Sequence, residues 1–403
     1  MGIHRVVTLL ACVAVSFGSN RTAGAQAQEP SRRGLIEQAQ AEKVKTLHPY
    51  PVTKGERVMN KVEDITVNGG LHWHPFLENA YAGGGFALGA GYMHHVSPYN
   101  LLDVRGSYSI RAYKRAEVEF MAPRMFQRRG TLSLLAGFRE ATQVGFYGTG
   151  TNSQKENRAN FGFQAWHGSA TMSIRPTRRL LLLRGGVELA EITEQPGEGS
   201  APSVDTVYTP ATLPGLDSRI TYLHTQGTAG LDWRPAADYA RRGGFYGVTF
   251  HDYKDNDERF GFQQVDYEIV QHIPILRETW AISLRALAET TWLKGDQQIP
   301  YFMLPSLGGG GNLRGYSSWR FRDRNSLLLQ GEWRIMVNRY LDTAFFYDAG
   351  KVAALTGDLD LNGLKQDFGF GVRFHGPIST PLRIDLAKSS EGLVLVFATS
   401  AAF

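Results

Sequence analysis

Hydrophobic and polar residues alternate along most of the chain, from about Ile65 to the carboxyl end, in segments of about 10–16 residues separated by turn signals. A period of two places successive side chains on opposite faces of a β-strand. The segment Arg324–Val337 shows the pattern most clearly. One face holds Leu327, Leu329, Gly331, Trp333, Ile335 and Val337, and the other holds Leu328, Gln330, Glu332, Arg334 and Met336.

The alternating segments are about twice as long as the ~5–6 residues usual in soluble sheets. They match the ~9–11 residues with which a tilted strand crosses a bilayer. We therefore predict an all-β fold, a 16-stranded antiparallel transmembrane β-barrel with a polar lumen, covering residues 65–403. The first strand is expected near Ile65–Leu77 and the last at Leu393–Phe403. If Leu101–Phe126 is one strand rather than two, the count falls to 14.

Strand parity assigns the connections to the two ends of this barrel. An amino-terminal tail in the periplasm makes odd-numbered strands run outward, so short turns lie on the periplasmic side. The long polar connections then lie outside, at Gly148–Asn157, Glu194–Asp217, Gly295–Asp323 and Thr356–Gln366.

The first 25 residues have the pattern of a cleavable signal peptide. An apolar stretch of 13 residues, Val6–Gly18, is followed by Ala23-Gly24-Ala25, which fits an A-x-A exit. Leu9–Cys12 also fits a lipoprotein cleavage box, which is the alternative. Residues 26–64 are polar and too few to build a core, so we expect a periplasmic tail or small plug there, with a short helix at Leu35–Leu47.

Composition excludes several classes of protein. The net charge is only +5 and the basic residues are scattered, whereas nucleic-acid binding needs a concentrated basic face. No apolar run after the leader approaches the ~18–20 residues of a membrane helix. The single cysteine, Cys12, lies in the leader, so the exported chain is expected to have neither disulfides nor a cysteine nucleophile.

The most distinctive segment is Gly308–Asp323, which reads GGGGNLRGYSSWRFRD on a long outward connection followed by five expected strands. It resembles the sixth loop of the outer-membrane barrel-assembly superfamily (BamA/TamA-like, bacterial surface antigen type). The resemblance covers roughly residues 71–403. It places the loop tip at Leu313, Arg314, Gly315 and Tyr316, and the stretch leading into the next strand at Arg320, Phe321, Arg322 and Asp323. Phe346–Gly350 and Phe146–Gly150 resemble two further elements of the family.

The resemblance implies a sixth loop inserted into the lumen and a non-enzymatic protein of the outer membrane of a Gram-negative bacterium. It also implies a role in membrane-protein insertion or translocation, with outer-membrane lipid and unfolded outer-membrane or secreted polypeptides as partners. Assembly factors of the family carry periplasmic POTRA domains. Residues 26–64 are too few for one, so a barrel-only member is expected.

Elementary electrostatics predicts how such a loop is held. An arginine in a low-dielectric lumen needs carboxylate partners with matching geometry. Parity places Glu332 and Asp348 on the polar faces of the two strands that follow, and Gly315 would let the tip approach the wall. We predict that Arg314, Glu332 and Asp348 pin the loop. The alternative is an ordinary solvated loop.

A weak seam is predicted where the barrel closes. The first strand contains Gly69, Gly70 and Pro75, and proline removes a ladder hydrogen bond. Its partner would be the last strand, which ends at Phe403. Poorly paired edges could accept a client strand. The alternative is a barrel that begins irregularly.

Other motifs carry no chemistry that we can complete. His72 and His74 lack a third ligand, and the calcium-like run Asp358-x-Asp360-x-Asn362 has Gly369 where a glutamate is needed. His251-Asp252 and His167/Ser169 complete no catalytic triad. We therefore expect no catalytic residues, metal or cofactor.

The alternative function is a narrow or gated channel, and the oligomeric state stays open. Charges of both signs on the polar faces suit either a plugged interior or a water path: Arg184, Glu188, Arg285, Glu289, Arg373 and Asp385.

Overall fold

A computed structural model describes residues 32–46, 54–66, 72–177, 180–276, 278–376 and 378–403. Contacts between residues divide the chain into two units, Met1–Arg57 and Val58–Phe403. The helices are α1 (Arg32–Thr46), α2 (Lys54–Thr66), α3 (Met125–Arg128) and α4 (Val204–Val207). None of these helices is long and apolar enough to cross a membrane. The helix expected at Leu35–Leu47 corresponds to α1.

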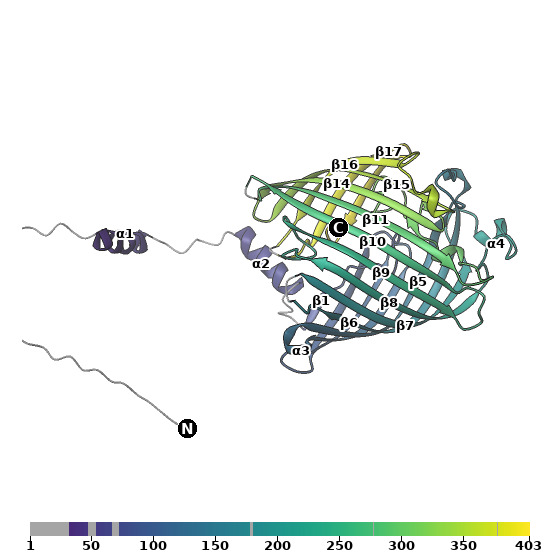
Figure 1. Ribbon diagram of the computed structural model, residues 1–403, viewed down its shortest axis with the longest axis horizontal. Coiled ribbons are helices and arrows are strands. Elements are labelled where there is room, and N and C mark those ends of the chain that lie inside the picture. The colour runs from purple at the N-terminus through teal and green to yellow at the C-terminus, as the bar shows by residue number, and fades with distance from the viewer. Residues whose placement is uncertain (1–31, 47–53, 67–71, 178–179, 277, 377) are drawn as a thin grey trace, which may run out of the picture. The chain divides into compact units, whose positions relative to one another are not determined.

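Sixteen strands form one antiparallel sheet in chain order, which curls into a barrel (Figure 1). They are β1 (Trp73–Pro75), β2 (Ala87–His95), β3 (Leu101–Ser109), β4 (Lys114–Arg124), β5 (Gly130–Phe146), β6 (Ala159–Ile174), β7 (Leu181–Pro196), β8 (Arg219–Asp232), β9 (Gly243–Asp255), β10 (Phe262–Ile275), β11 (Trp280–Leu293), β14 (Asn325–Asn338), β15 (Leu341–Ala353), β16 (Lys365–Phe374), β17 (Leu382–Ser389) and β18 (Gly392–Ala398).

The predicted number of strands is confirmed. Leu101–Phe126 contains two strands, β3 and β4, so the alternative of 14 is wrong. Five strands of the large sheet follow Gly308–Asp323, as the sequence predicted. Only four residues connect β3 to β4. The alternation pattern alone therefore did not show where the first strand ends and the second begins.

The predicted bounds of the first and last strands are wrong. Helix α2 extends to Thr66, and β1 covers only Trp73–Pro75. Residues 58, 62 and 65 are apolar at helical spacing, which favours a helix over the expected strand at this point. The last strand ends at Ala398 rather than at Phe403.

Burial separates the two faces of the sheet. On β15, Asp342 and Asp348 are 0% exposed, whereas Phe345 and Tyr347 between them are about half exposed. We call the first side the polar face and the second the apolar face. The apolar face is the side suited to lipid, because hydrophobic side chains there remain uncovered.

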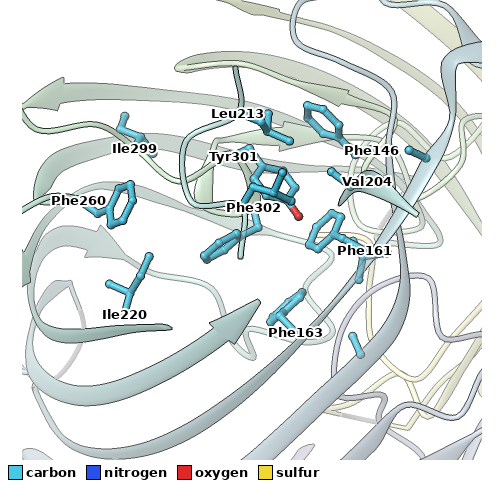
Figure 2. Packing of buried hydrophobic residues seen from close by; sticks show 14 of the residues in the cluster. Phe146, Phe161, Phe163, Val204, Leu213, Ile220, Phe260, Ile299, Tyr301 and Phe302 are labelled. Carbon is cyan, nitrogen blue, oxygen red and sulfur yellow. The ribbon is translucent and has the colours of Figure 1, made fainter. Parts of the chain in front are cut away.

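The connections differ in length at the two ends of the barrel. Short turns join β2–β3, β4–β5, β6–β7, β10–β11, β14–β15 and β16–β17 at one end, called here the turn end. The long connections lie at the opposite end, the loop end, and are folded rather than extended. Buried aromatic residues of these connections and of the adjoining strand ends pack together in a cluster that Figure 2 shows. It includes Phe146 of β5, Phe161 and Phe163 of β6, and Tyr301 and Phe302 of the β11–β14 connection.

Candidate functional site

The connection between β11 and β14 contains a small hairpin of its own. Its two short strands, β12 (Ser306–Leu307) and β13 (Phe321–Arg322), pair antiparallel. We call residues 306–323 the loop-six segment. Its turn starts at Gly308, where φ is 115° and an added Cβ would collide with the carbonyl oxygen of Ser317. A residue with a side chain would therefore be strained at this position.

Arg314 lies at the centre of the loop-six segment and is 0% exposed. Its Nε and Nη2 donate to the two carboxylate oxygens of Asp348 at 2.7 and 2.8 Å, and its Nη1 donates to Glu332 Oε2 at 2.8 Å. The guanidinium carbon also lies 3.5 Å from the centre of the Phe346 ring. This is a forked ion pair with a cation–π contact beneath it.

The sheet register brings the two carboxylates together. Asp348 of β15 is opposite Gln330 of β14, and Glu332 is opposite Phe346, so both acids stand on the polar face. Arg373 of β16 donates to Glu332 at 2.8 Å and to Asp385 of β17 at 2.5 Å. Four adjacent strands and the loop-six segment therefore place Arg314 and Arg373 among three carboxylates. Two further arginines lie beside them, Arg334 at 3.8 Å from Glu332 and Arg383 at 3.5 Å from Asp385.

The charge balance keeps Arg314 ionised. Burial alone would lower the pKa of its guanidinium, but the hydrogen bonds and charge of Asp348, followed by the charge of Glu332, outweigh burial and raise that pKa. A buried charge without such partners is strongly destabilising. The geometry thus makes Arg314 and the acids on the strands mutually dependent.

The residues beside Arg314 seat the tip against the strands. A Cβ on Gly315 would lie 2.5 Å from the Cβ of Asp367, so glycine permits a close approach. The Gly315 carbonyl accepts a hydrogen bond from Ser389 at 2.7 Å, and the Tyr316 hydroxyl donates to the Gln366 carbonyl at 3.2 Å. Leu313 is 0% exposed in an apolar cluster with Leu307 and Phe321.

Arg320 holds the strand-proximal part of the segment to the rest of the loop end. Its Nε donates to Glu391 at 2.8 Å, and its remaining nitrogens donate to Ser153 at 2.7 and 2.9 Å. Its guanidinium carbon lies 4.7 Å from the centre of the Tyr147 ring.

Arg322 differs from Arg314 in its partners. It donates to the carbonyl oxygens of Tyr301 and Phe302 at 3.3 and 3.1 Å and has no carboxylate partner in the described part of the chain. Burial lowers its pKa to about 10. The next residue, Asp323, accepts a hydrogen bond from the Arg324 backbone at 2.8 Å, and burial raises the pKa of its carboxyl.

Phe146–Gly150 leads into the connection between β5 and β6, which braces the loop-six segment. The Gly150 backbone donates to the Arg322 carbonyl at 2.8 Å. Thr151 and Val352 of β15 form two hydrogen bonds, of 2.6 and 2.8 Å. Sequence reasoning singled out this motif without a structural role, because its partners are about 170 to 200 residues away.

Of the predicted seam residues, the two that the structure describes, Pro75 and Phe403, are not paired with each other. Gly69 and Gly70 lie outside the described residues, and Pro75 ends β1 opposite Ala90. Phe403 belongs to no strand; its ring is nearly parallel to that of His272, with centres 6.4 Å apart. Among the described residues, no ladder joins β1 to β18.

The histidine and aspartate motifs have separate partners. His74 is paired with Asp103 at 2.9 Å, and Asp360 with Lys351 at 2.7 Å. His251 lies between His224 and Asp266 rather than beside a serine. Within the ranges that the structure covers, no group of three or more His, Cys, Asp or Glu residues could hold a metal ion.

Comparisons with known proteins agree with this geometry. The fold resembles BamA from Haemophilus ducreyi lacking POTRA domains 1–3, with a TM-score of 0.57 and 14% identity over 81% of this chain and 67% of that one. It also resembles CdiB from Escherichia coli, with a TM-score of 0.53 and 11% identity over 80% of this chain and 58% of that one. No curated protein matches the sequence.

The family is shown by the sequence itself. The Omp85 superfamily domain matches residues 100–392, which include the loop-six segment and every barrel strand from β3 to β17 in full. The Omp85 superfamily is non-enzymatic, resides in the outer membrane and handles polypeptide clients. This chain belongs to the Omp85 superfamily and is a non-enzymatic outer-membrane β-barrel.

Proposed function

We propose that this protein inserts or translocates polypeptides at the outer membrane through a weak seam between β1 and β18. The observation that carries the proposal is the mismatch between these two edge strands. β1 has three residues, whereas β18 has seven, all paired with β17. The opposite edge of β18 has no strand partner among the described residues.

An unpaired strand edge is reactive in a membrane. Backbone groups that lack partners in lipid are strongly destabilised, and a free edge is a template for an added strand. The apolar side chains of β18, Leu393, Leu395 and Phe397, are 56–66% exposed. A client strand pairing here would satisfy the edge while its own apolar side chains faced lipid.

The loop-six segment supplies the rigidity that such a seam requires. Arg314 and Arg373 connect acids on β14, β15 and β17, and Ser389 of β17 holds Gly315. In the proposal this lock keeps the last strands in place while the edge of β18 is unpaired. The segment acts as a lumen-inserted plug that stabilises the open-edged wall.

Client folding in liposomes tests the function. A urea-unfolded small barrel would be presented to the reconstituted protein, to Arg314→Ala and to the control Arg219→Ala, whose side chain is 68% exposed at the loop end. We expect faster client folding with the protein and with the control, and loss of the acceleration with Arg314→Ala. Absence of acceleration by the folded protein would overturn the proposal.

Photo-crosslinking tests the seam. A photoreactive amino acid at Leu395 of β18 is compared with one at Ile269 of β10, since the two side chains are similarly exposed, at 56% and 51%. Client adducts at Leu395 and none at Ile269 are expected. Equal labelling at both positions would mean that clients do not use the seam.

A channel is the second candidate, because the polar face of β7–β10 is only partly covered. Glu188, Asp266 and Glu268 have side chains that are 36%, 24% and 29% exposed. Water can therefore reach charges of this wall although the loop-six segment lies against β14–β17. Ohmic conductance that persists in planar bilayers with the loop-six segment intact, together with no client acceleration, would favour the channel.

A further inference from the structure

The connection between β8 and β9 is the longest at the turn end. It spans residues 233–242, and we call it the β8–β9 connection. Tyr239, Ala240 and Arg241 within it are at most 9% exposed. Their partners lie on β14 and β15 and in the turns after β10 and β16, so the connection lies across the turn end rather than beside its own strands.

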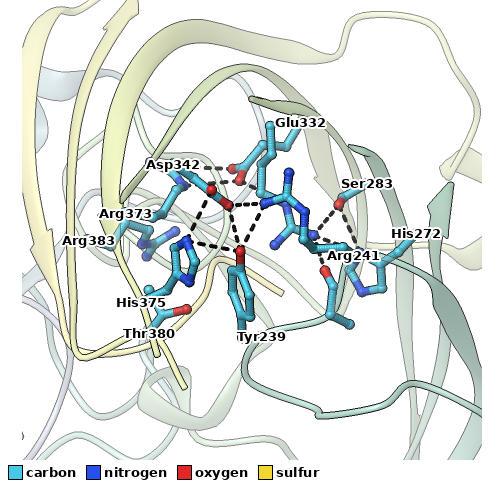
Figure 3. Close-up of polar contacts among 12 residues, drawn as sticks. Tyr239, Arg241, His272, Ser283, Glu332, Asp342, Arg373, His375, Thr380 and Arg383 are labelled. Atoms are coloured by element: carbon cyan, nitrogen blue, oxygen red, sulfur yellow. Dashed lines mark hydrogen bonds and ion pairs between the residues drawn. The ribbon is translucent and has the colours of Figure 1, made fainter. Parts of the chain in front are cut away.

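Asp342 of β15 binds two side chains of the β8–β9 connection (Figure 3). Arg241 forms an ion pair with Asp342, and the Tyr239 hydroxyl donates to the same carboxylate at 3.0 Å. His375 lies 3.1 Å from the other Asp342 oxygen, and its ring stacks on Tyr239 with centres 4.0 Å apart. Arg241 also donates to the carbonyls of Glu278 and Thr279.

Asp238 ties two further parts of the chain to this connection. Its two carboxylate oxygens accept the backbone N–H groups of Thr380 at 2.8 Å and Ala401 at 2.9 Å. The Thr380 hydroxyl donates to the Asp238 carbonyl at 3.0 Å. Thr380 is in the turn between β16 and β17, and Ala401 is in the five-residue tail that follows β18, residues 399–403.

The tail turns away from the strand edge. Ala401, Ala402 and Phe403 line a small, partly open cavity. Its other lining residues include Tyr239 of the β8–β9 connection and Glu332 and Arg373 of the polar face. The tail thus occupies the interior at the turn end. It does not continue along the edge that β18 would offer to β1.

We propose that the β8–β9 connection is a clamp that positions the carboxyl-terminal tail, with Asp238 as the positioning residue and Arg241–Asp342 as its anchor. The clamp fixes the length of β18 at its turn end and hence the length of edge open to β1 or to a client strand. The effect on clients rests on the proposed function. The position of the tail does not.

The clamp is tested by measuring where the tail lies. Spin labels are attached to cysteines introduced at Ser400 in the tail and at Gln127 in the β4–β5 turn, both exposed. The natural cysteine, Cys12, lies in the leader that the exported chain is expected to lose. Distance distributions are compared for the parent protein, Asp238→Ala, Asp238→Asn and the control Asp257→Ala, an exposed acid of the β9–β10 connection. Heat modifiability on gels verifies that each variant is folded.

Asp238→Ala should raise the population of displaced tail roughly tenfold or more, because hydrogen bonds to a charged group are the strong ones. Asp238→Asn keeps one acceptor oxygen and should give an intermediate distribution, and Asp257→Ala should match the parent. An unchanged distribution in folded Asp238→Ala would overturn the clamp.

Client folding with the same variants separates the two proposals. Faster client folding by Asp238→Ala than by the parent supports the clamp as a regulator of the seam. A displaced tail in a protein that never accelerates clients leaves the clamp standing and overturns the proposed function. If the parent accelerates client folding but the tail of Asp238→Ala is not displaced, the proposed function stands and the clamp is overturned.

Discussion

Two arginines reach the same strand from opposite ends of the barrel. Arg314 of the loop-six segment binds Asp348 of β15, and Arg241 of the β8–β9 connection binds Asp342, six residues earlier on the same face. At ~3.3 Å per residue the two aspartates are about 20 Å apart. Both aspartates are 0% exposed. The loop-six segment and the β8–β9 connection thus each pair with one buried aspartate of β15.

The surroundings of the two pairs differ. Around Arg314 three further arginines and two further carboxylates complete a network that extends over four strands. Asp342 has one arginine, and its other partners are the Tyr239 hydroxyl and the His375 ring. Removing Arg314 would leave Asp348 with the Gln330 amide and no arginine, and Glu332 with one bond fewer. Asp342 would retain two hydrogen-bonding partners after Arg241 is removed.

The largest effect is expected for Arg314→Ala. Breaking a buried ion pair by removing one partner destabilises by about 3–5 kcal/mol, and the acids left behind would push the loop-six segment off the strands. The free energy of unfolding in urea and trypsin cleavage after Arg320 and Arg322 measure this. An unchanged free energy of unfolding and unchanged resistance to trypsin would contradict the expectation that the Arg314 site contributes more stability than the Arg241 site.

Arg241→Ala is expected to have a smaller effect, about 2 kcal/mol, since Tyr239 and His375 continue to bind Asp342. The same urea titration measures it, with Arg242→Ala as the matched control because the Arg242 side chain is 64% exposed. A loss equal to that of Arg314→Ala would show that the number of acids does not set the difference.

Gly315→Ala tests the approach of the loop-six segment without changing charge. Its new methyl group would meet Asp367 and Ser389, and overpacking of this kind costs about 1–3 kcal/mol. Gly311→Ala is the control, because nothing lies within 4 Å of a Cβ there. Equal stability of the two variants would show that the tip of the loop-six segment can shift to accommodate the added methyl group.

The smallest expected quantity is the coupling between the two sites. Changes more than ~7–10 Å apart with no shared partner are usually additive within about 0.5 kcal/mol. Arg241 and Arg314 share no carboxylate, although Arg334 lies 3.8 Å from Glu332 and donates to the Ala240 carbonyl. The double variant Arg314→Ala/Arg241→Ala should therefore lose close to the sum of the single losses. A discrepancy larger than this would mean that Arg334 or β15 couples the two sites.

Sequence patterns predicted one of these sites and missed the other, for a physical reason. Strand alternation is local, so it placed Glu332 and Asp348 on the polar face, and a family resemblance marked the loop containing Arg314. The β8–β9 connection, with the sequence WRPAADYARR, reads as an ordinary polar turn. Its partners lie about 100 to 160 residues later, and no local period encodes such a contact.

The start of the barrel was mispredicted for a related reason. Apolar residues at 58, 62 and 65 fit a helix, but the strand pattern downstream was extended back over Ile65. The short β1 and the departure of the tail at Thr399 depend on what each edge can pair with. That is a property of the closed sheet and not of either segment alone.

The position of β15 in the chain sets an order of assembly. Arg241 and Arg314 both precede this strand, and their acids at 342 and 348 come only after twelve of the sixteen barrel strands. A chain truncated before β15 would have two cations with no aspartate to receive them. Completion of both pairs therefore reports that most of the barrel wall has formed. A truncation or frameshift before β15 would leave Arg241 without its acid and Arg314 with Glu332 of β14 alone.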